Sequence, residues 1–235
     1  AKVFLEQIKR YTEEMRYGTG NGEISIVADL PYNEAFLPHW QEFSNALQQY
    51  HYHLKHSSKQ REESKLYLYG ITLPKEVIDL LAKALKSTHF EELILMRNHF
   101  GQKGIEFSLD YLKNNPLLKW LTLSNNPINS MDDINKLCKI IEAHPSIENL
   151  ALDNCKGGDI NGYVMLTRIM TAGKNKLKFI DLSNNRIRTE GRTYICDFLA
   201  TNLILTDLFL ENNQLSDNDA IGIAEALRQN TKLFF

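Results

Sequence analysis

Three stretches of this sequence contain side chains that could bind a metal ion, bind a phosphate or act as a nucleophile. The first is the run HYHLKH, in which His51, His53 and His56 could ligate a metal ion. Two ligands on one helix face need a spacing of four, as in H-E-x-x-H, whereas these spacings are two, three and five. His53 and His56 alone share a face, and the pattern holds no carboxylate or cysteine. We therefore predict no metal site here, and a solvent-facing side of a helix.

The other two groups are the glycine-rich stretch GTGNG from Gly18 and the thiol of Cys155. GTGNG lacks the Lys-Ser/Thr of a phosphate-binding loop and precedes a predicted strand, so we expect a turn. Cys155 is expected to be buried, which makes a thiol inert, and no histidine is placed to serve it as a base. The acidic pair Asp132 and Asp133 suits the start of a helix. The chain is predicted not to be an enzyme and to use no cofactor.

A phrase that recurs every 28 to 30 residues determines the predicted fold. Its copies are FEELILMRNHF from Phe90, LKWLTLSNNPI from Leu118, IENLALDNCKG from Ile147, LKFIDLSNNRI from Leu177 and LTDLFLENNQL from Leu205. Each reads L-x-x-L-x-L-x-x-(Asn or Cys)-x-L, with conservative changes at the apolar sites, which is the signature of a leucine-rich repeat. A weaker copy, SKLYLYGITL, comes first and has Ile71 in the Asn position.

Within each phrase the apolar residues alternate, as they do on a strand with one buried face. The predicted inward residues are Leu66, Leu68, Leu121, Leu123, Leu150, Leu152, Ile180, Leu182, Leu208 and Leu210. The polar residue that ends each strand is expected to satisfy buried backbone groups of the following turn. These residues form a predicted structural ladder: Asn98, Asn126, Cys155, Asn185 and Asn213.

Repeats of this length, each with a full helix after its strand, resemble the ribonuclease-inhibitor-like subfamily. That subfamily includes ribonuclease inhibitor, the sensor arms of NOD-like receptors, tropomodulin and Ran GTPase-activating protein. The resemblance implies an α/β leucine-rich repeat solenoid, a curved horseshoe with a parallel β-sheet on its concave face and α-helices on its convex face. It covers residues 63–235, with about six repeats. Richness in Asn, Lys and Ile also looks like the eukaryotic-like repeat effectors of intracellular bacteria.

Residues 1–62 break the period and are predicted to form an α-helical N-terminal cap with a first strand. An amphipathic helix carries Phe4, Ile8, Tyr11 and Met15, the stretch EISIVADL reads as the strand, and a long helix follows the N-cap Asn33. The run HSSKQREESK is a predicted solvated connection. At the other end, Leu233 begins a seventh phrase that stops two residues later, so we expect a truncated C-terminal end.

The composition of the chain indicates which classes of partner and which cellular compartment to expect. A net charge of -2 argues against nucleic acid or an anionic membrane as the main partner, and no apolar run reaches the ~20 residues of a spanning helix. Three cysteines do not make a disulfide framework, and no Asn-x-Ser/Thr sequon is present. The chain starts at Ala1 without a signal peptide, as a trimmed fragment would. We predict a cytoplasmic protein, or one in a host cytosol if it is a secreted bacterial effector.

Outward strand positions supply the predicted partner-binding residues of the concave face. They are Tyr67, Tyr69, Ile94, Met96, Trp120, Asp153, Phe179, Asp181, Asp207, Phe209 and Glu211. The early ones are apolar and the late ones mix acids with aromatics, a composition typical of interface hot spots. The partner is predicted to be a protein with an apolar knob and a basic patch, and no small-molecule substrate is expected. The alternative is that each aromatic simply packs on its neighbours.

The predicted function is therefore a non-enzymatic protein–protein interaction module. The resemblance to ribonuclease inhibitor implies one specific role, in which the module inhibits a partner enzyme by covering its active site. An alternative is a regulator of a small GTPase, although the acidic tail of Ran GTPase-activating protein is absent, and another is a bacterial effector that acts on a host protein. Actin-end capping, as in tropomodulin, needs actin-binding segments outside the repeats, and residues 1–62 show no clear one.

Overall fold

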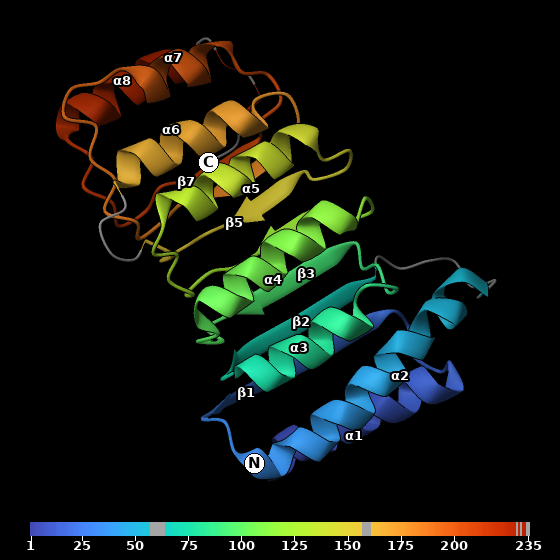
Figure 1. The fold of residues 1–235 in the computed structure, drawn as a ribbon. Coiled ribbons are helices and arrows are strands. Elements are labelled where there is room, and N and C mark those ends of the chain that lie inside the picture. Colours follow the sequence, from blue (N-terminus) through green and yellow to red (C-terminus); the bar gives the residue numbers. More distant parts are fainter. Residues whose placement is uncertain (57–63, 157–160, 229, 231, 234–235) are drawn as a thin grey trace. The chain divides into compact units, whose positions relative to one another are not determined.

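The computed structural model describes residues 1–56, 64–156, 161–228, 230 and 232–233, with the backbone alone for residues 51–56. The described chain alternates strands and helices (Figure 1) and divides into two compact units. Unit 1 is Ala1–Thr122 and unit 2 is Leu123–Phe235. The predicted boundary at residue 62 stays a prediction, because it falls outside the described residues.

Unit 1 has four parallel strands that lie in chain order. Its elements are α1 (Lys2–Tyr17), β1 (Glu23–Leu30), the 3-10 turn η1 (Glu34–Phe36), α2 (Leu37–His56), β2 (Lys65–Ile71), α3 (Lys75–Ala84), β3 (Glu92–Met96), α4 (Gly101–Asn114) and β4 (Trp120–Thr122). β1 pairs with β2, β2 with β3 and β3 with β4, so that Ile24 lies opposite Leu66 and Leu66 opposite Leu93. All three side chains are buried, as the strand alternation predicts.

The first strand of unit 1 is an edge whose backbone would otherwise be open. Val27 N–H donates to Gln7 Oε1 at 2.8 Å, and Gln7 Nε2 donates back to the Val27 carbonyl at 3.2 Å. A side chain from α1 thereby occupies edge groups to which another chain could add a strand. This contact, with the packing of α1 on α2 and β1, supports a capping role for residues 1–62, which stays a proposal.

Capping residues determine where the helices of unit 1 begin and end. The GTGNG stretch is the predicted turn, because Gly18 ends α1 with φ +64 and its N–H bonds to the Glu14 carbonyl. Asn33 is an N-cap as predicted, accepting from Ala35 N at 2.9 Å, but the helix that it starts begins as the 3-10 turn η1 before α2 continues. The side chains of His51, His53 and His56, and the residues of the predicted connection from 57 to 63, lie outside the described part of the chain.

Unit 2 repeats the same plan with shorter strands. Its elements are α5 (Met131–Ala143), β5 (Asn149–Ala151), α6 (Gly162–Gly173), β6 (Phe179–Asp181), α7 (Tyr194–Thr201), β7 (Asp207–Phe209) and α8 (Asp217–Leu227). β5 pairs with β6 and β6 with β7, all parallel. Leu150 and Ile180 are buried, whereas Leu208 on β7 is half-buried. The structure confirms the predicted α/β leucine-rich repeat fold in the strand–helix alternation of both units.

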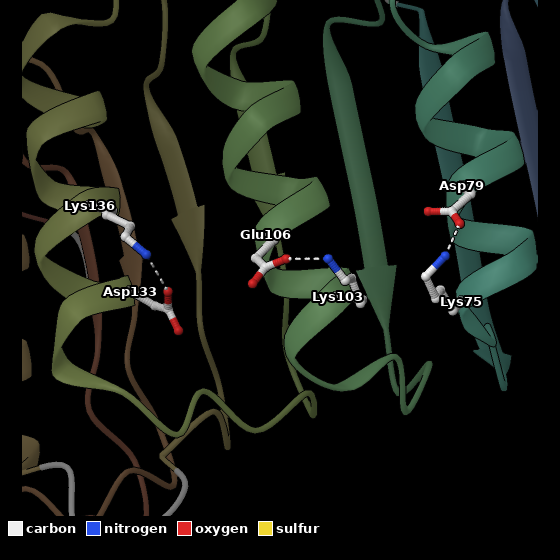
Figure 2. A network of polar contacts seen from close by, with 6 residues as sticks. All are labelled: Lys75, Asp79, Lys103, Glu106, Asp133 and Lys136. Carbon is white, nitrogen blue, oxygen red and sulfur yellow. Dashed lines mark hydrogen bonds and ion pairs between the residues drawn. The ribbon is translucent and has the colours of Figure 1, made fainter.

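The helices carry charged side chains that pair within their own helix. Figure 2 shows Lys75 with Asp79 on α3, Lys103 with Glu106 on α4, and Asp133 with Lys136 on α5. Pairs three or four residues apart stabilise a helix by only about 0.2–0.5 kcal/mol. They nevertheless pair these six charges within their own helices.

The tightest backbone contact in unit 1 predicts an effect on stability. Gly70 has φ +69, and a Cβ built on it would lie 2.0 Å from the Ala28 carbonyl oxygen of β1. We expect Gly70→Ala to lower the free energy of unfolding by about 2–4 kcal/mol, because it adds left-handed strain and pushes β1 from β2. Urea unfolding followed by circular dichroism measures this change.

Gly101 provides the matched control for that variant. Its φ is +56, but a Cβ there would meet nothing within 4 Å. Gly101→Ala should therefore cost only the left-handed strain, about 1 kcal/mol. Equal losses in the two variants would show that the approach of β1 to Gly70 does not limit stability.

Candidate functional site

The strands end in a set of buried polar side chains that bond to backbone groups of neighbouring repeats. In unit 1, Asn98 Nδ2 donates to the Leu68 carbonyl at 2.9 Å, and Asn98 Oδ1 accepts from Ile71 N at 3.2 Å. Ile71, which stands in the Asn position of the weak first repeat, therefore donates its backbone N–H to the next rung, as Asn185 N does to Asn213 Oδ1.

In unit 2 the same contacts form a continuous ladder. Asn185 Nδ2 donates to the Leu152 carbonyl, and its Oδ1 accepts from Cys155 N and Lys156 N. Asn213 does the same one repeat later, with the Leu182 carbonyl as acceptor and Asn185 N and Ile187 N as donors. Asn126 donates to the carbonyls of Leu123 and Ser124.

Cys155 occupies one rung of this ladder with sulfur in place of an amide. Its Sγ lies 3.1 Å from the Leu123 carbonyl and 3.5 Å from the Asp153 carbonyl, as a weak donor. The side chain has 0% exposure, and burial raises the pKa of the thiol to about 12. A thiol held in this way is a structural group and lacks the activation that a nucleophile needs.

A second polar ladder stands at the opposite ends of the strands, which the sequence analysis did not identify. Asn202 Nδ2 donates to the Lys174 carbonyl, while its Oδ1 accepts from Ile204 N and Leu205 N. His144 Nδ1 accepts from Ser146 N and Ile147 N. Asn115 and Asn230 make similar contacts. Each of these four residues precedes the first apolar residue of a phrase by three positions, a regularity that would have revealed them.

The strand face of unit 1 consists of the predicted residues Tyr67, Tyr69, Ile94, Met96 and Trp120. All five are partly exposed, and the pairing of β2 with β3 sets Tyr67 opposite Ile94 and Tyr69 opposite Met96. The rings of Tyr67 and Tyr69 are 6.3 Å apart, and partial burial raises the pKa of Tyr67. The five residues form a half-buried apolar surface with hydroxyl groups, a combination common at protein interfaces.

The strand face of unit 2 consists of the predicted residues Asp153, Phe179, Asp181, Asp207, Phe209 and Glu211. The rings of Phe179 and Phe209 lie 5.3 Å apart at 42°, a favourable aromatic pair. Register sets Phe179 opposite Asp207 and Asp181 opposite Phe209, so that rings and carboxylates alternate. Phe209 is 40% exposed, the most exposed aromatic of the predicted contact residues in either unit.

The carboxylates of this face differ in how many hydrogen bonds they accept within the chain. Asp153 accepts from Asn184 Nδ2 at 2.7 Å and from Asn125 Nδ2 at 3.3 Å, so both of its oxygens are engaged. Asp181 accepts from its own turn through Ser183 N, and Asp207 from Thr206 Oγ1. Asp153 therefore has a structural function beside its predicted binding role, which repeat spacing alone could not show.

Two further features bear on the predicted chemistry. Within the residues that the structure describes, no cluster of three or more His, Cys, Asp or Glu side chains is placed to hold a metal ion. In the same part of the chain, no helix has the length and apolar character to cross a bilayer.

Comparison with known proteins agrees with the repeat assignment. A family model described as Leucine Rich repeat matches residues 86–107 and 173–196. The chain is 29% identical over 133 residues to mouse NACHT, LRR and PYD domains-containing protein 5, covering 55% of this chain and 11% of that protein. It is 28% identical over 165 residues to mouse ribonuclease inhibitor, covering 69% of this chain and 36% of that protein. The chain thus spans well under two thirds of either relative.

Among solved structures, the tropomodulin C-terminal domain of Caenorhabditis elegans aligns with a TM-score of 0.51 at 16% identity, covering 65% of this chain and 92% of that one. At that identity the likeness concerns the fold alone. The matched repeats, the buried ladder and the alternating strands and helices agree with one another. The chain contains leucine-rich repeats and has an α/β leucine-rich repeat fold.

The burial of Cys155 predicts a reactivity order among the three cysteines. A pKa of about 12 leaves roughly one thiol in ten thousand ionised near pH 8, and Cys138 is also buried with a pKa raised to about 11. Cys196 is only partly buried. We expect an alkylating reagent to modify Cys196 first in the native protein, as read by mass spectrometry of peptides. In denaturant all three should react at similar rates. Native labelling of Cys155 as fast as Cys196 would contradict the buried rung.

Proposed function

We propose that this chain is a non-enzymatic module that binds a partner protein through the outward side chains of its strands. The observation that carries the proposal is the strand face of unit 2, where the exposed ring of Phe209 packs at a tilt against Phe179 beside carboxylates. Nothing in the packing of a repeat requires large aromatic side chains at outward positions. Aromatic residues ringed by polar groups are the residues in which interface binding energy concentrates.

The chemistry of this face defines the partner. The paired rings favour an apolar side chain, and the neighbouring carboxylates Asp181, Asp207 and Glu211 favour Lys or Arg around it. The partner is proposed to present an apolar knob within a basic patch. Polar side chains hold the chain before β5 and β7 and after β5 and β6, so little conformational entropy is lost when the face is occupied.

A finer proposal concerns the outcome of binding. One relative is called ribonuclease inhibitor, and its similarity to this chain covers 69% of the chain. We propose that a partner enzyme bound on the strand face would be inhibited by steric cover of its active site. The chain itself need supply no catalytic group for this effect. The proposed setting is the cytoplasm.

The proposal predicts a specific loss of binding in a double variant of unit 2. Phe179→Ser with Phe209→Ser should weaken the affinity for the partner at least thirtyfold, because hot-spot residues contribute about 2 kcal/mol or more. A tagged chain captures candidates from cytosolic lysate, and mass spectrometry identifies them. Titration calorimetry with the purified candidate then gives the dissociation constant. If the partner is an enzyme, its activity is measured with increasing amounts of the chain.

Leu203→Ser with Ile204→Ser is the matched control. Leu203 is 60% exposed and Ile204 40% exposed, and both are apolar residues of unit 2 that lie outside the strand face. The control should keep wild-type affinity, and both double variants should unfold at wild-type temperature. If the Phe179→Ser/Phe209→Ser variant binds the partner as tightly as the control does, the strand-face proposal is wrong.

A further inference from the structure

A polar pocket lies in unit 2, lined by residues that follow β5, β6 and β7 and by the start of α6. Its volume is about 440 Å³, within the range of sites that hold small organic groups. Its lining consists of Lys156, Asn161, Gly162, Arg186, Arg188, Glu190 and Gln214. Three of these side chains are cations and one is an anion, in a chain whose net charge is -2. The pocket thus differs in sign from the acidic strand face of the same unit.

The ladder fixes the backbone of the residues that line this pocket. Lys156 follows the rung Cys155, Arg186 follows Asn185, and Gln214 follows Asn213, so the three occupy the same position in successive repeats. Lys156 N donates to Asn185 Oδ1 at 2.8 Å. Asn213 Oδ1 accepts from the residues on both sides of Arg186, each at 3.0 Å. The side chains of Asn185, which is buried, and of Asn213, which is partly exposed, therefore set the spacing of the cations.

One wall of the pocket depends on a glycine. A Cβ on Gly162 would lie 2.6 Å from the Asn185 carbonyl oxygen and 3.2 Å from that of Arg186. Only a residue without a side chain lets the start of α6 approach the backbone of Arg186 so closely. This contact locates α6 against the loop from which Arg186 and Arg188 extend.

Existing contacts leave most of the donors in the pocket available. Glu190 pairs with Arg192 at 2.9 Å, which reduces its ability to neutralise the other cations. Arg188 donates through Nε to Gln214 Oε1, so the contact orients the guanidinium while leaving its two terminal nitrogens. Among the residues that the structure describes, no carboxylate lies within ion-pair distance of Lys156, Arg186 or Arg188.

From this arrangement we propose that the pocket binds a phosphate monoester group. A phosphate monoester carries nearly two negative charges at neutral pH and three acceptor oxygens, which match two guanidinium forks and an ammonium. The volume exceeds what the phosphate alone requires, so part of the molecule that carries it also fits. A phosphorylated side chain and a small phosphate ester share this chemistry. The inference concerns a site of opposite charge to the strand face and does not rest on the function proposed for that face.

The test compares three probes by titration calorimetry: inorganic phosphate, a phosphoserine peptide and the same peptide without phosphate. Arg186→Gly with Arg188→Gln removes both forks, and Arg168→Gln removes an exposed arginine of α6 that does not line the pocket. We expect the double variant to weaken phosphate binding at least tenfold and the control to leave it within twofold. Binding should strengthen as the pH rises through about 6, where the phosphate takes its second charge.

The double variant is not expected to lose stability. Arg186 has φ +53, a conformation that glycine adopts without strain, so thermal unfolding should occur at or above the wild-type temperature. Amide chemical shifts of Lys156 and Arg186 provide a second measurement on the wild type with millimolar phosphate. If the phosphopeptide binds more tightly than inorganic phosphate, the ligand is a phosphorylated protein. If the two bind equally, the ligand is a small phosphate ester. Affinity that is the same in the double variant and the control, or no shift at either amide, would overturn the proposal.

Discussion

Backbone groups become buried where each strand turns into its loop, and the need to give them hydrogen-bond partners determines how the repeats stack. A turn in this position cannot reach water, and each unpaired group would cost about 1–3 kcal/mol. Asn213 alone bonds to two carbonyls and two amides, from its own repeat and the one before. A rung therefore joins adjacent repeats at a single spacing, since any other offset leaves several partners unmatched.

The second ladder extends this constraint to the other end of the strands. His144 holds the chain between α5 and β5, and Asn202 joins the loop before β7 to the loop before β6. Strands of only three residues are thereby supported at both ends. Three residues are too few for ladder hydrogen bonds alone to define a rigid surface. The outward side chains of β5, β6 and β7 are thus positioned by groups that point away from the strand face.

The spacing of the repeats predicted the inward leucines and the polar rungs, because a fixed period dictates which backbone positions recur. It did not predict which outward side chains hydrogen-bond to one another. Asn125 and Asn184, for example, both donate to Asp153. Those contacts depend on side-chain reach between repeats, which a period does not encode. The repeat period likewise did not predict that Lys156 and Arg186 share a pocket, because that pocket depends on the close backbone contact at Gly162.

The positions beside each rung are where the sequence is free to vary, and there the backbone conformation becomes informative. The residue before the rung has positive φ in every repeat described, and it is Gly70, Asn125, Asn154, Asn184 or Asn212 at five of six places. Arg97 is the sixth, with φ +54, at a cost of order 1 kcal/mol that Asn largely avoids. Its guanidinium bonds to Tyr69 and lies 3.6 Å from Asp29. Arg97 thus links the end of β3 to β2 and β1, so a side chain on a strained backbone connects three strands of unit 1.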